Sequence, residues 1–196
     1  WRPTVMGFYS SLFKMRGSVK VDFVGFKNYI DIVTDTNFLT VLFNTLKYTG
    51  FSLLIGFPPP LIIAIMLNEV RKGQYFFRMA SYIPVVLPGI AVYMLWSYLY
   101  GAGPDGLLNT IAGFFGADPY VWLQDSRFAI IWIVITMTWS GMGGTILMYF
   151  AALQGINPDL YEAAALDGAK IRHKLRYIVL PEVYPIALLL FVKQII

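Results

Sequence analysis

The sequence predicts an all-α, polytopic integral membrane protein, a helical bundle with three complete spans and a truncated fourth. Three observations predict this class. Of the 196 residues, 58% are hydrophobic and only 13% are charged, whereas soluble domains carry about 25% charged residues. The mean hydropathy is +0.63. The charged residues also leave three long uncharged runs between them. The chain begins at Trp1 and is still apolar at its end, so we expect it to be a fragment of a longer protein.

Each uncharged run is long enough to cross a membrane. The runs are residues 48–68, 79–104 and 128–158, with 21, 26 and 31 residues. About 20 apolar residues cross a hydrocarbon core of about 30 Å as a helix. A fourth span is expected to begin after Glu182 and to be cut off at the end of the chain.

The charges of the short loops predict the orientation of the spans. The connection after the first run carries Arg71, Lys72 and Arg78 against Glu69, and the 157–181 segment carries four basic residues against three acidic ones. Residues 105–127 carry three acids and one base. Because short basic loops stay in the cytoplasm, the 157–181 loop is predicted inside and the 101–127 loop outside. By parity residues 1–43 also lie outside, although they hold five basic residues: Arg2, Lys14, Arg16, Lys20 and Lys27.

The chain divides into two predicted parts. Residues 1–40 are expected to form an outer-face, interfacial segment, and the membrane domain is expected to run from residue 41 to residue 196. The loop at 101–127 is rich in glycine and proline, and aromatic residues flank it at the depth of an interfacial belt. These aromatics anchor the loop or contact an arriving solute; they are Trp96, Tyr98, Tyr100, Tyr120 and Trp122.

Residues 157–181 form a polar segment between two apolar runs, which we call the island, and its sequence predicts two short helices. Residues 157–159 read Asn-Pro-Asp, which favours a helix start through its cap, its first-turn proline and its acid near the positive dipole end. Alanines at 163–165 give a small-residue surface, and Gly168 marks a turn that a larger residue would straighten or block. A second helix is expected over 169–177, after which Pro181 should set a new direction. We expect a helix-turn-helix knob at the inner membrane face.

This island resembles the EAA loop of the permease subunits of ATP-binding-cassette (ABC) importers. The resemblance rests on Glu162, Ala163, Ala164, Asp167, Gly168, Ala169, Ile178, Leu180 and Pro181. Leu175 departs from the pattern, since many relatives have an aromatic residue there. Weaker matches at 80–84, 106–109, 122–123 and 153–156 favour the binding-protein-dependent sugar permeases, which are maltose-transporter-like.

The resemblance implies a fold, a role and a set of partners. The fold is the type I ABC importer transmembrane domain, in a bacterial-type cytoplasmic (inner) membrane. In that family the loop docks in a cleft on the ATPase. The resemblance therefore implies coupling roles for seven residues: Glu162, Ala163, Ala164, Asp167, Gly168, Ala169 and Pro181. The implied partners are a second permease subunit in a homo- or heterodimer, two cytoplasmic ATPase subunits that bind ATP and Mg, and an extracytoplasmic solute-binding protein. No nucleic acid is implied.

The chain itself shows no motif for catalysis, a cofactor or a metal. It has no Gly-x-x-x-x-Gly-Lys-Ser/Thr phosphate loop, no cysteine and one histidine, His173. We therefore expect a transporter subunit rather than an enzyme, with ATP hydrolysis by a partner.

Three residues inside the spans are candidates for the substrate path. Trp139 beside Ser140 either packs in a glycine-rich helix or lines a sugar path, since aromatic faces stack on sugar rings. Lys193 is expected about 10 Å into the last span, where it attracts an anionic solute or snorkels to the inner interface. The prolines at 58–60 should disrupt the first span, which gives a packing kink or a solute site.

The most specific function predicted is the import of a carbohydrate, an oligosaccharide. An anionic sugar, such as a sugar phosphate or a uronate oligosaccharide, is the alternative within this class. From other classes, an ion-coupled secondary transporter would show an internal repeat, and an intramembrane enzyme would need a polar catalytic pair inside the spans. Neither feature stands out in the sequence.

Overall fold

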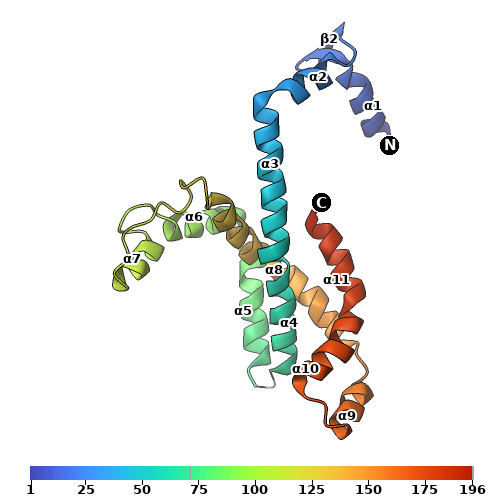
Figure 1. The fold of residues 1–196 in the computed structure, drawn as a ribbon, viewed down its shortest axis with the longest axis vertical. Coiled ribbons are helices and arrows are strands. Elements are labelled where there is room, and N and C mark those ends of the chain that lie inside the picture. The colour runs from blue at the N-terminus through green and yellow to red at the C-terminus, as the bar shows by residue number, and fades with distance from the viewer. Residues whose placement is uncertain (71, 196) are drawn as a thin grey trace. The chain divides into compact units, whose positions relative to one another are not determined.

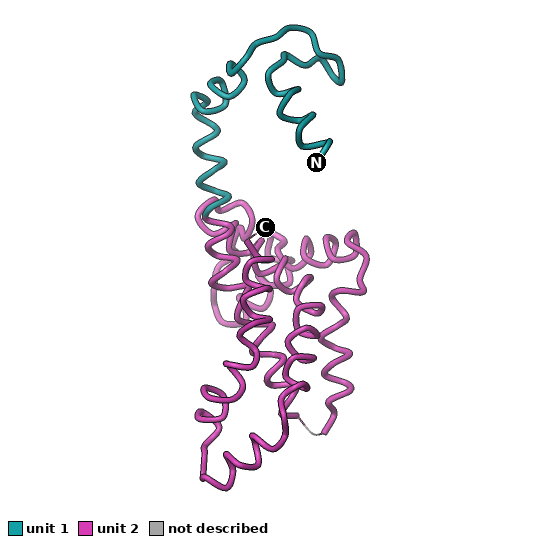
Figure 2. Tube along the Cα trace, turned by 90° about the vertical axis from the view of Figure 1, so that its right-hand side faces the viewer, with its two compact units in different colours: residues 1–46 teal, residues 47–196 magenta. Residues whose placement is uncertain are grey.

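The computed structural model describes residues 1–70 and 72–195. Arg71, one of the cations used to predict the orientation, lies outside the described residues. The chain forms two compact units, residues 1–46 and residues 47–196 (Figure 2).

The first unit holds a small hairpin between short helices. Helix α1 (Arg2–Ser11) leads to strands β1 (Phe13–Arg16) and β2 (Val19–Phe23), and α2 (Lys27–Thr34) follows. The strands are antiparallel, and Phe13 pairs with Phe23 across them with ring centroids 5.2 Å apart. This two-stranded sheet was not predicted from the sequence, and it is the one strand pair in an otherwise helical set of described elements.

The first long helix is continuous through its prolines. Helix α3 (Thr36–Phe51), the π-helical turn η1 (Ser52–Gly56) and α4 (Pro58–Glu69) form one apolar helix of 34 residues (Figure 1). The prolines occupy the first turn of α4, where a missing backbone donor is tolerated. The predicted disruption is confirmed for the α-helical pattern, which gives way to one π turn and a bend at Phe57, with the Phe57 amide donating to the Ser52 carbonyl at 3.0 Å. The segment nevertheless continues as one long helix. Such π turns are frequent at functional sites.

The second predicted span, 79–104, is not a straight helix. Helices α5 (Gln74–Val86) and α6 (Gly89–Leu99) meet at an angle of 98°. The bend falls at Leu87, which is extended at φ −67° and ψ 133° because Pro88 disfavours the helical conformation in the residue before it. Neither helix alone reaches the ~20 residues that a straight span requires.

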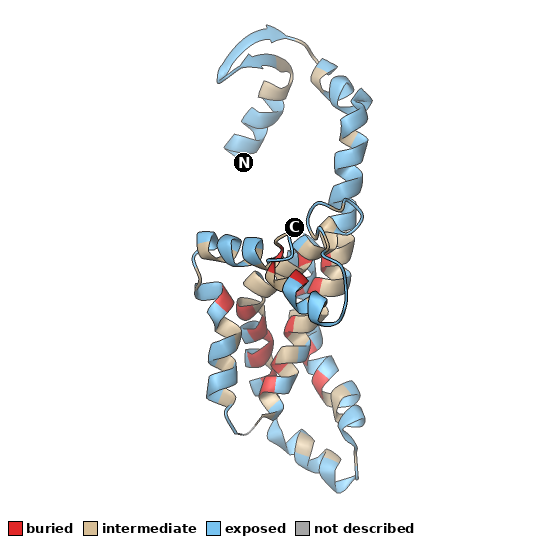
Figure 3. Ribbon diagram, turned by 90° about the vertical axis from the view of Figure 1, so that its left-hand side faces the viewer, coloured by how far each residue is buried: buried red, intermediate tan, exposed pale blue. Residues whose placement is uncertain are grey.

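Helix α8 (Ala129–Gln154) is the centre of the second unit and packs against α4, α5 and α11. The buried side chains gather where these helices meet (Figure 3). Gly143 allows the close crossing with α5, because a Cβ there would lie 2.9 Å from the Ser81 carbonyl oxygen. The core consists of Ala64, Leu67, Ile146, Tyr149, Phe150, Leu153, Ile156, Val179, Val183 and Leu190.

The last helix starts well before the predicted Glu182. Helix α10 (Ile171–Lys174), the π turn η2 (Leu175–Val179) and α11 (Leu180–Ile195) form one apolar helix of 25 residues. Pro181 was predicted to set a new direction after the second helix of the knob. It lies instead in the first turn of α11, within this one helix. The wider turn explains this, because the Leu180 amide donates to the Leu175 carbonyl, five residues back.

A buried asparagine organises the loop between α6 and α8, which includes α7 (Leu107–Phe114). Asn109 is 3% exposed. Its Nδ2 donates to the carbonyls of Gly101, Gly103 and Tyr120 at 3.0–3.1 Å. Its Oδ1 accepts from the Tyr120 amide at 3.0 Å and from Trp122 Nε1 at 2.9 Å. The Asn109 side chain on α7 thus connects residues 101–103 with residues 120–122.

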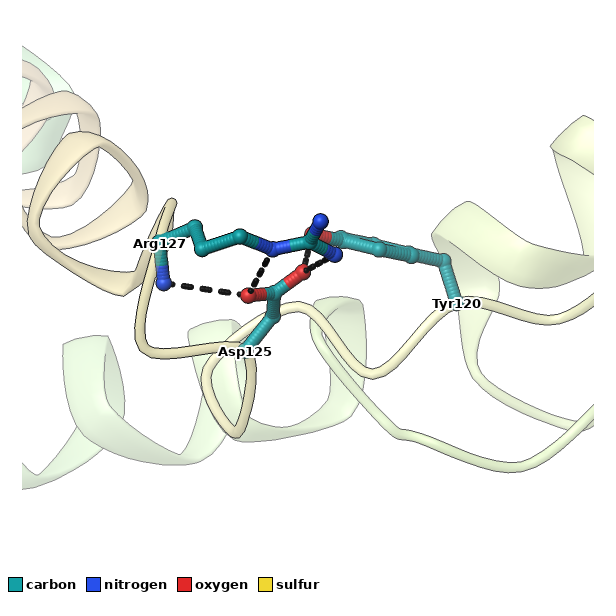
Figure 4. Close-up of polar contacts among 3 residues, drawn as sticks. All are labelled: Tyr120, Asp125 and Arg127. Carbon is teal, nitrogen blue, oxygen red and sulfur yellow. Dashed lines mark hydrogen bonds and ion pairs between the residues drawn. The ribbon is translucent and has the colours of Figure 1, made fainter.

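An ion pair closes the same loop just before α8 (Figure 4). Arg127 donates from its Nε and its backbone amide to Asp125 Oδ1 at 3.0 Å, and from its terminal nitrogen to Oδ2 at 2.7 Å. The Tyr120 hydroxyl donates to Oδ2 at 2.7 Å. These donors hold the pKa of the Asp125 carboxyl well below its ordinary value, the hydrogen bonds from Arg127 being the largest cause.

Candidate functional site

The knob, residues 157–178, begins at a capped helix. In α9 (Pro158–Leu166) the Asn157 Oδ1 accepts from the Asp159 amide at 3.0 Å. Pro158 takes the first helical position, and Asp159 lies in the first turn. The predicted cap is confirmed in each of these details.

A left-handed glycine ends the first helix of the knob. Gly168 has φ +70°. The Gly168 amide donates to the Ala165 carbonyl at 3.1 Å, and the Ala169 amide donates to the Ala164 carbonyl at 2.9 Å. This pair of bonds is the Schellman motif. The predicted turn is confirmed, but a Cβ at Gly168 would meet nothing within 4 Å. A larger residue there is opposed by the backbone conformation and not by space.

The tip of the knob presents apolar side chains to its surroundings. Leu166 is 90% exposed and Ile171 is 75% exposed, and they flank the Gly168 turn. Sequence reasoning had not selected either residue, although both are apolar residues inside a polar island. The predicted residues Glu162, Ala163 and Asp167 are exposed on the same segment.

The base of the knob is attached to the helical bundle. Tyr161 of α9 and Leu175 and Ile178 of η2 pack against the buried core. Burial raises the pKa of the Tyr161 hydroxyl, and the Glu69 carboxylate raises it further. Both arms of the knob therefore contact the core. Six of the predicted loop residues lie on the knob, and Pro181 lies beyond it in α11.

A polar cavity of about 260 Å³ lies between the three long helices. Ser52, Thr138 and Gln194 line it from η1, α8 and α11. Gln194 Nε2 donates to Ser52 Oγ at 2.5 Å. Gly56 lets the helices approach here, because a Cβ would lie 2.7 Å from Thr138 Oγ1. The three polar residues were not predicted, since they come from helices far apart in the sequence.

Lys193 also lines this cavity. Its helix begins at Ile171, in the knob, and Lys193 lies about 33 Å along that helix. No acidic residue is among those that line the cavity within the described chain.

The other two path candidates lie elsewhere. The Trp139 ring packs edge-on against Trp96, with centroids 5.7 Å apart. Ser140 lines a separate, mostly apolar hollow of about 420 Å³ beside the α5–α6 bend. The structure thus separates these two residues from Lys193. Within residues 1–70 and 72–195, no group of three or more His, Cys, Asp or Glu side chains is placed to hold a metal ion.

The chain is similar to permease proteins of known transport systems. It is 34% identical over 178 residues to the arabinooligosaccharides transport system permease protein AraP of Bacillus subtilis (strain 168), covering 90% of this chain and 56% of that protein. It is 30% identical over 181 residues to the polygalacturonan/rhamnogalacturonan transport system permease protein YteP of the same organism, covering 91% of this chain and 56% of that protein.

A solved structure has the same fold. The crystal structure of a bacterial ABC transporter involved in the import of the acidic polysaccharide alginate matches with a TM-score of 0.85 and 28% identity, covering 98% of this chain and 65% of that one. The chain therefore spans little more than half the length of these relatives. Residues 56–196 match the family described as "Binding-protein-dependent transport system inner membrane component". That match covers more than half of the chain, which therefore belongs to this family of inner membrane transport components.

Proposed function

We propose that this chain is part of the membrane-spanning permease subunit of an ATP-driven, binding-protein-dependent importer of carbohydrates. The observation that carries the proposal is the knob: an apolar tip at Leu166 and Ile171 on a rigid turn, with its base in the bundle core. The names of the similar proteins, transport systems for arabinooligosaccharides and for galactooligosaccharides, support an oligosaccharide as the solute.

The knob is the point at which a partner drives the subunit. Two cytoplasmic ATPase subunits bind ATP and Mg and close below the membrane, and the tip of the knob follows the cleft in which it sits. A second permease subunit completes the pathway, and an extracytoplasmic binding protein delivers the solute. One of the similar structures is that of a bacterial alginate ABC transporter in complex with a periplasmic protein that holds an alginate pentasaccharide. That complex supports a solute-binding protein as a partner of this chain. In this arrangement the 157–181 loop is cytoplasmic and the 101–127 loop is outside.

The cavity lined by Ser52, Thr138 and Gln194 is our candidate for this subunit's half of the path. Counted along their helices from the ends near the knob, these residues lie about 24–35 Å in. Hydroxyl and amide groups that line a cavity can replace the water hydrogen bonds of a sugar. The adjoining π turn makes this stretch of helix the least regular part of the first span.

A second candidate solute is an anionic saccharide, and Lys193 favours it. A cation in a cavity without an acidic partner attracts a carboxylate or phosphate, and charged residues in spans are commonly functional. Two similar transport systems bear names that specify acidic solutes, alginate and sn-glycerol-3-phosphate.

Transport by the full-length subunit with its partners in proteoliposomes tests both proposals. Uptake should require ATP, Mg and the binding protein and should survive ionophores that collapse ion gradients. Loss of uptake with the gradients would instead identify an ion-coupled transporter. Lys193→Met should lower uptake of an acidic oligosaccharide about tenfold, the loss of one hydrogen-bonded charge, and leave a neutral one unchanged. Equal effects on both solutes would contradict the anionic assignment.

A further inference from the structure

A second cation of interest, Arg78 of α5, contacts an aromatic ring in the bundle. Its guanidinium stacks on Phe150 of α8, with Cζ 3.9 Å from the ring centroid. Its Nε is buried and has no hydrogen-bond partner among the described residues. Arginine has five donors and keeps its charge, and burial of unpaired donors is unfavourable. The position is therefore incomplete without an acceptor from outside this part of the chain.

A small cavity provides the place for that acceptor. It has a volume of about 200 Å³ and lies between α4, α5 and α8. Arg78, Ser81, Tyr82 and Gln154 give it polar groups, and the rest of its lining is apolar apart from backbone. The Tyr82 hydroxyl is also buried without a partner among the described residues. Arg78 and Tyr82 are four residues apart on α5, so their donors belong to the same helix face.

The cavity lies near the ends of the helices that line it. Gln154 is the last residue of α8, Leu67 is near the end of α4, and Arg78 is in the second turn of α5. Helix α8 has 26 residues and is about 39 Å long, which exceeds a hydrocarbon core of about 30 Å. At least one end of a helix of this length reaches the polar layer when the helix crosses the membrane upright, and Gln154 is the last residue at one end.

The surface beside the cavity suits an acyl chain. Met79 and Ile83 on α5 and Leu147 on α8 are each about half exposed and apolar. A phosphate that entered the cavity could therefore keep its acyl chains on an apolar helix surface. A water-soluble anion has no acyl chain that could cover that apolar surface.

We infer that the Arg78 cavity binds the phosphate of an anionic phospholipid. Arg78 donates to the phosphate oxygens, and Tyr82 and Gln154 supply further donors. Basic pockets between membrane helices on the cytoplasmic side bind head groups in this way. The lipid is a structural ligand at the base of α5, separate from the knob and from the cavity lined by Lys193.

Native mass spectrometry of the detergent-purified complex of the full-length subunit with its partner subunits, with phosphatidylglycerol added, tests this inference. Arg78→Gln should lower the bound phosphatidylglycerol about fivefold, the effect of one cation near a membrane surface, and Tyr82→Phe should lower it less. Arg78→Lys should keep part of the binding. Lys72→Gln is the matched control, because Lys72 is an exposed cation that does not line the cavity, and it should change nothing.

Three results would overturn the inference. One is equal lipid retention by Arg78→Gln and the unchanged protein. Another is displacement of the lipid by millimolar inorganic phosphate, which would assign the cavity to a free anion. The third is loss of a partner subunit from Arg78→Gln with lipid content unchanged, which would assign Arg78 to a carboxylate of that partner. Bound lipid is counted without ATP or solute, so this test is independent of the transport function.

Discussion

Replacement of Gly168 tests whether the shape of the knob matters for coupling. The residue is held at φ +70° by two backbone hydrogen bonds, and a side chain there would have open space. The effect of a substitution therefore comes from the backbone alone. An L-residue in this conformation is disfavoured by about 1–2 kcal/mol, which lowers the population of the turn about 5- to 30-fold if an alternative shape is available. Valine should be worse than alanine because it is β-branched.

Gly168→Asn is the matched control, since asparagine tolerates left-handed conformations. The assay compares ATP hydrolysis stimulated by the loaded binding protein with solute uptake in the same proteoliposomes. We expect Gly168→Val to remain in the membrane and to retain basal hydrolysis while uptake falls at least fivefold. Gly168→Ala should be intermediate, and Gly168→Asn should be close to the unchanged protein. Normal uptake by the valine variant, or equal loss in the asparagine and valine variants, would refute this reasoning.

Three further predictions concern the helical bundle and the loop between α6 and α8. Asn109→Asp removes the donor of three hydrogen bonds and should destabilise the loop by about 3 kcal/mol or more, seen as faster proteolysis there; an unchanged rate would argue against its organising role. Gly143→Ala places a Cβ 2.9 Å from a backbone oxygen, whereas Gly144→Ala meets nothing within 4 Å. The first should lower stability in detergent by about 1–3 kcal/mol and the second should not, so equal melting temperatures would count against the close crossing. Because the pKa of Asp125 is lowered in the folded loop, its stabilising effect is present above the ordinary value of about 3.9 and is lost as the pH falls through the lower, folded value. Near-UV circular dichroism of Asp125→Asn should therefore differ from that of the unchanged protein by a constant amount between pH 8 and 5, and a difference that closes above pH 5 would contradict the assignment.

Local signals in the sequence were sufficient for the knob. The cap at Asn157 and the turn at Gly168 each depend on a few neighbouring residues, so residue type alone predicts them. The tip residues Leu166 and Ile171 were missed because exposure depends on what packs nearby, which a single segment does not reveal.

Hydropathy predicted membrane helices but not their shape. The run at 79–104 satisfies a length criterion, yet Pro88 bends it by 98°. The prolines at 58–60 and Pro181 lie within long helices that are not sharply bent. In each case a π turn precedes the proline. A proline's effect depends on whether the preceding turn can widen, and that is decided by packing.

Contacts between distant segments could not be predicted. Ser52 and Gln194 are 142 residues apart and share a hydrogen bond. Asn109 is one polar residue in a polar loop, and its five hydrogen bonds come from residues up to 13 positions away. Neither pattern has a short-range signature in the sequence.

Cross-linking from Leu166 tests the central claim, that the knob docks on an ATPase subunit, most directly. Residues 1–196 hold no cysteine, so Leu166→Cys adds a reactive thiol to this part of the protein at a side chain that is 90% exposed, and the complex without this substitution gives the background reaction. Phe114→Cys is the control, since Phe114 is 83% exposed on the predicted outer loop. In the full-length complex we expect a short bifunctional reagent to join Leu166→Cys to the ATPase subunit, with a yield that changes when ATP binds, and Phe114→Cys to give no such product. Absence of the Leu166→Cys product in an active complex, or an equal yield from Phe114→Cys, would contradict the claim.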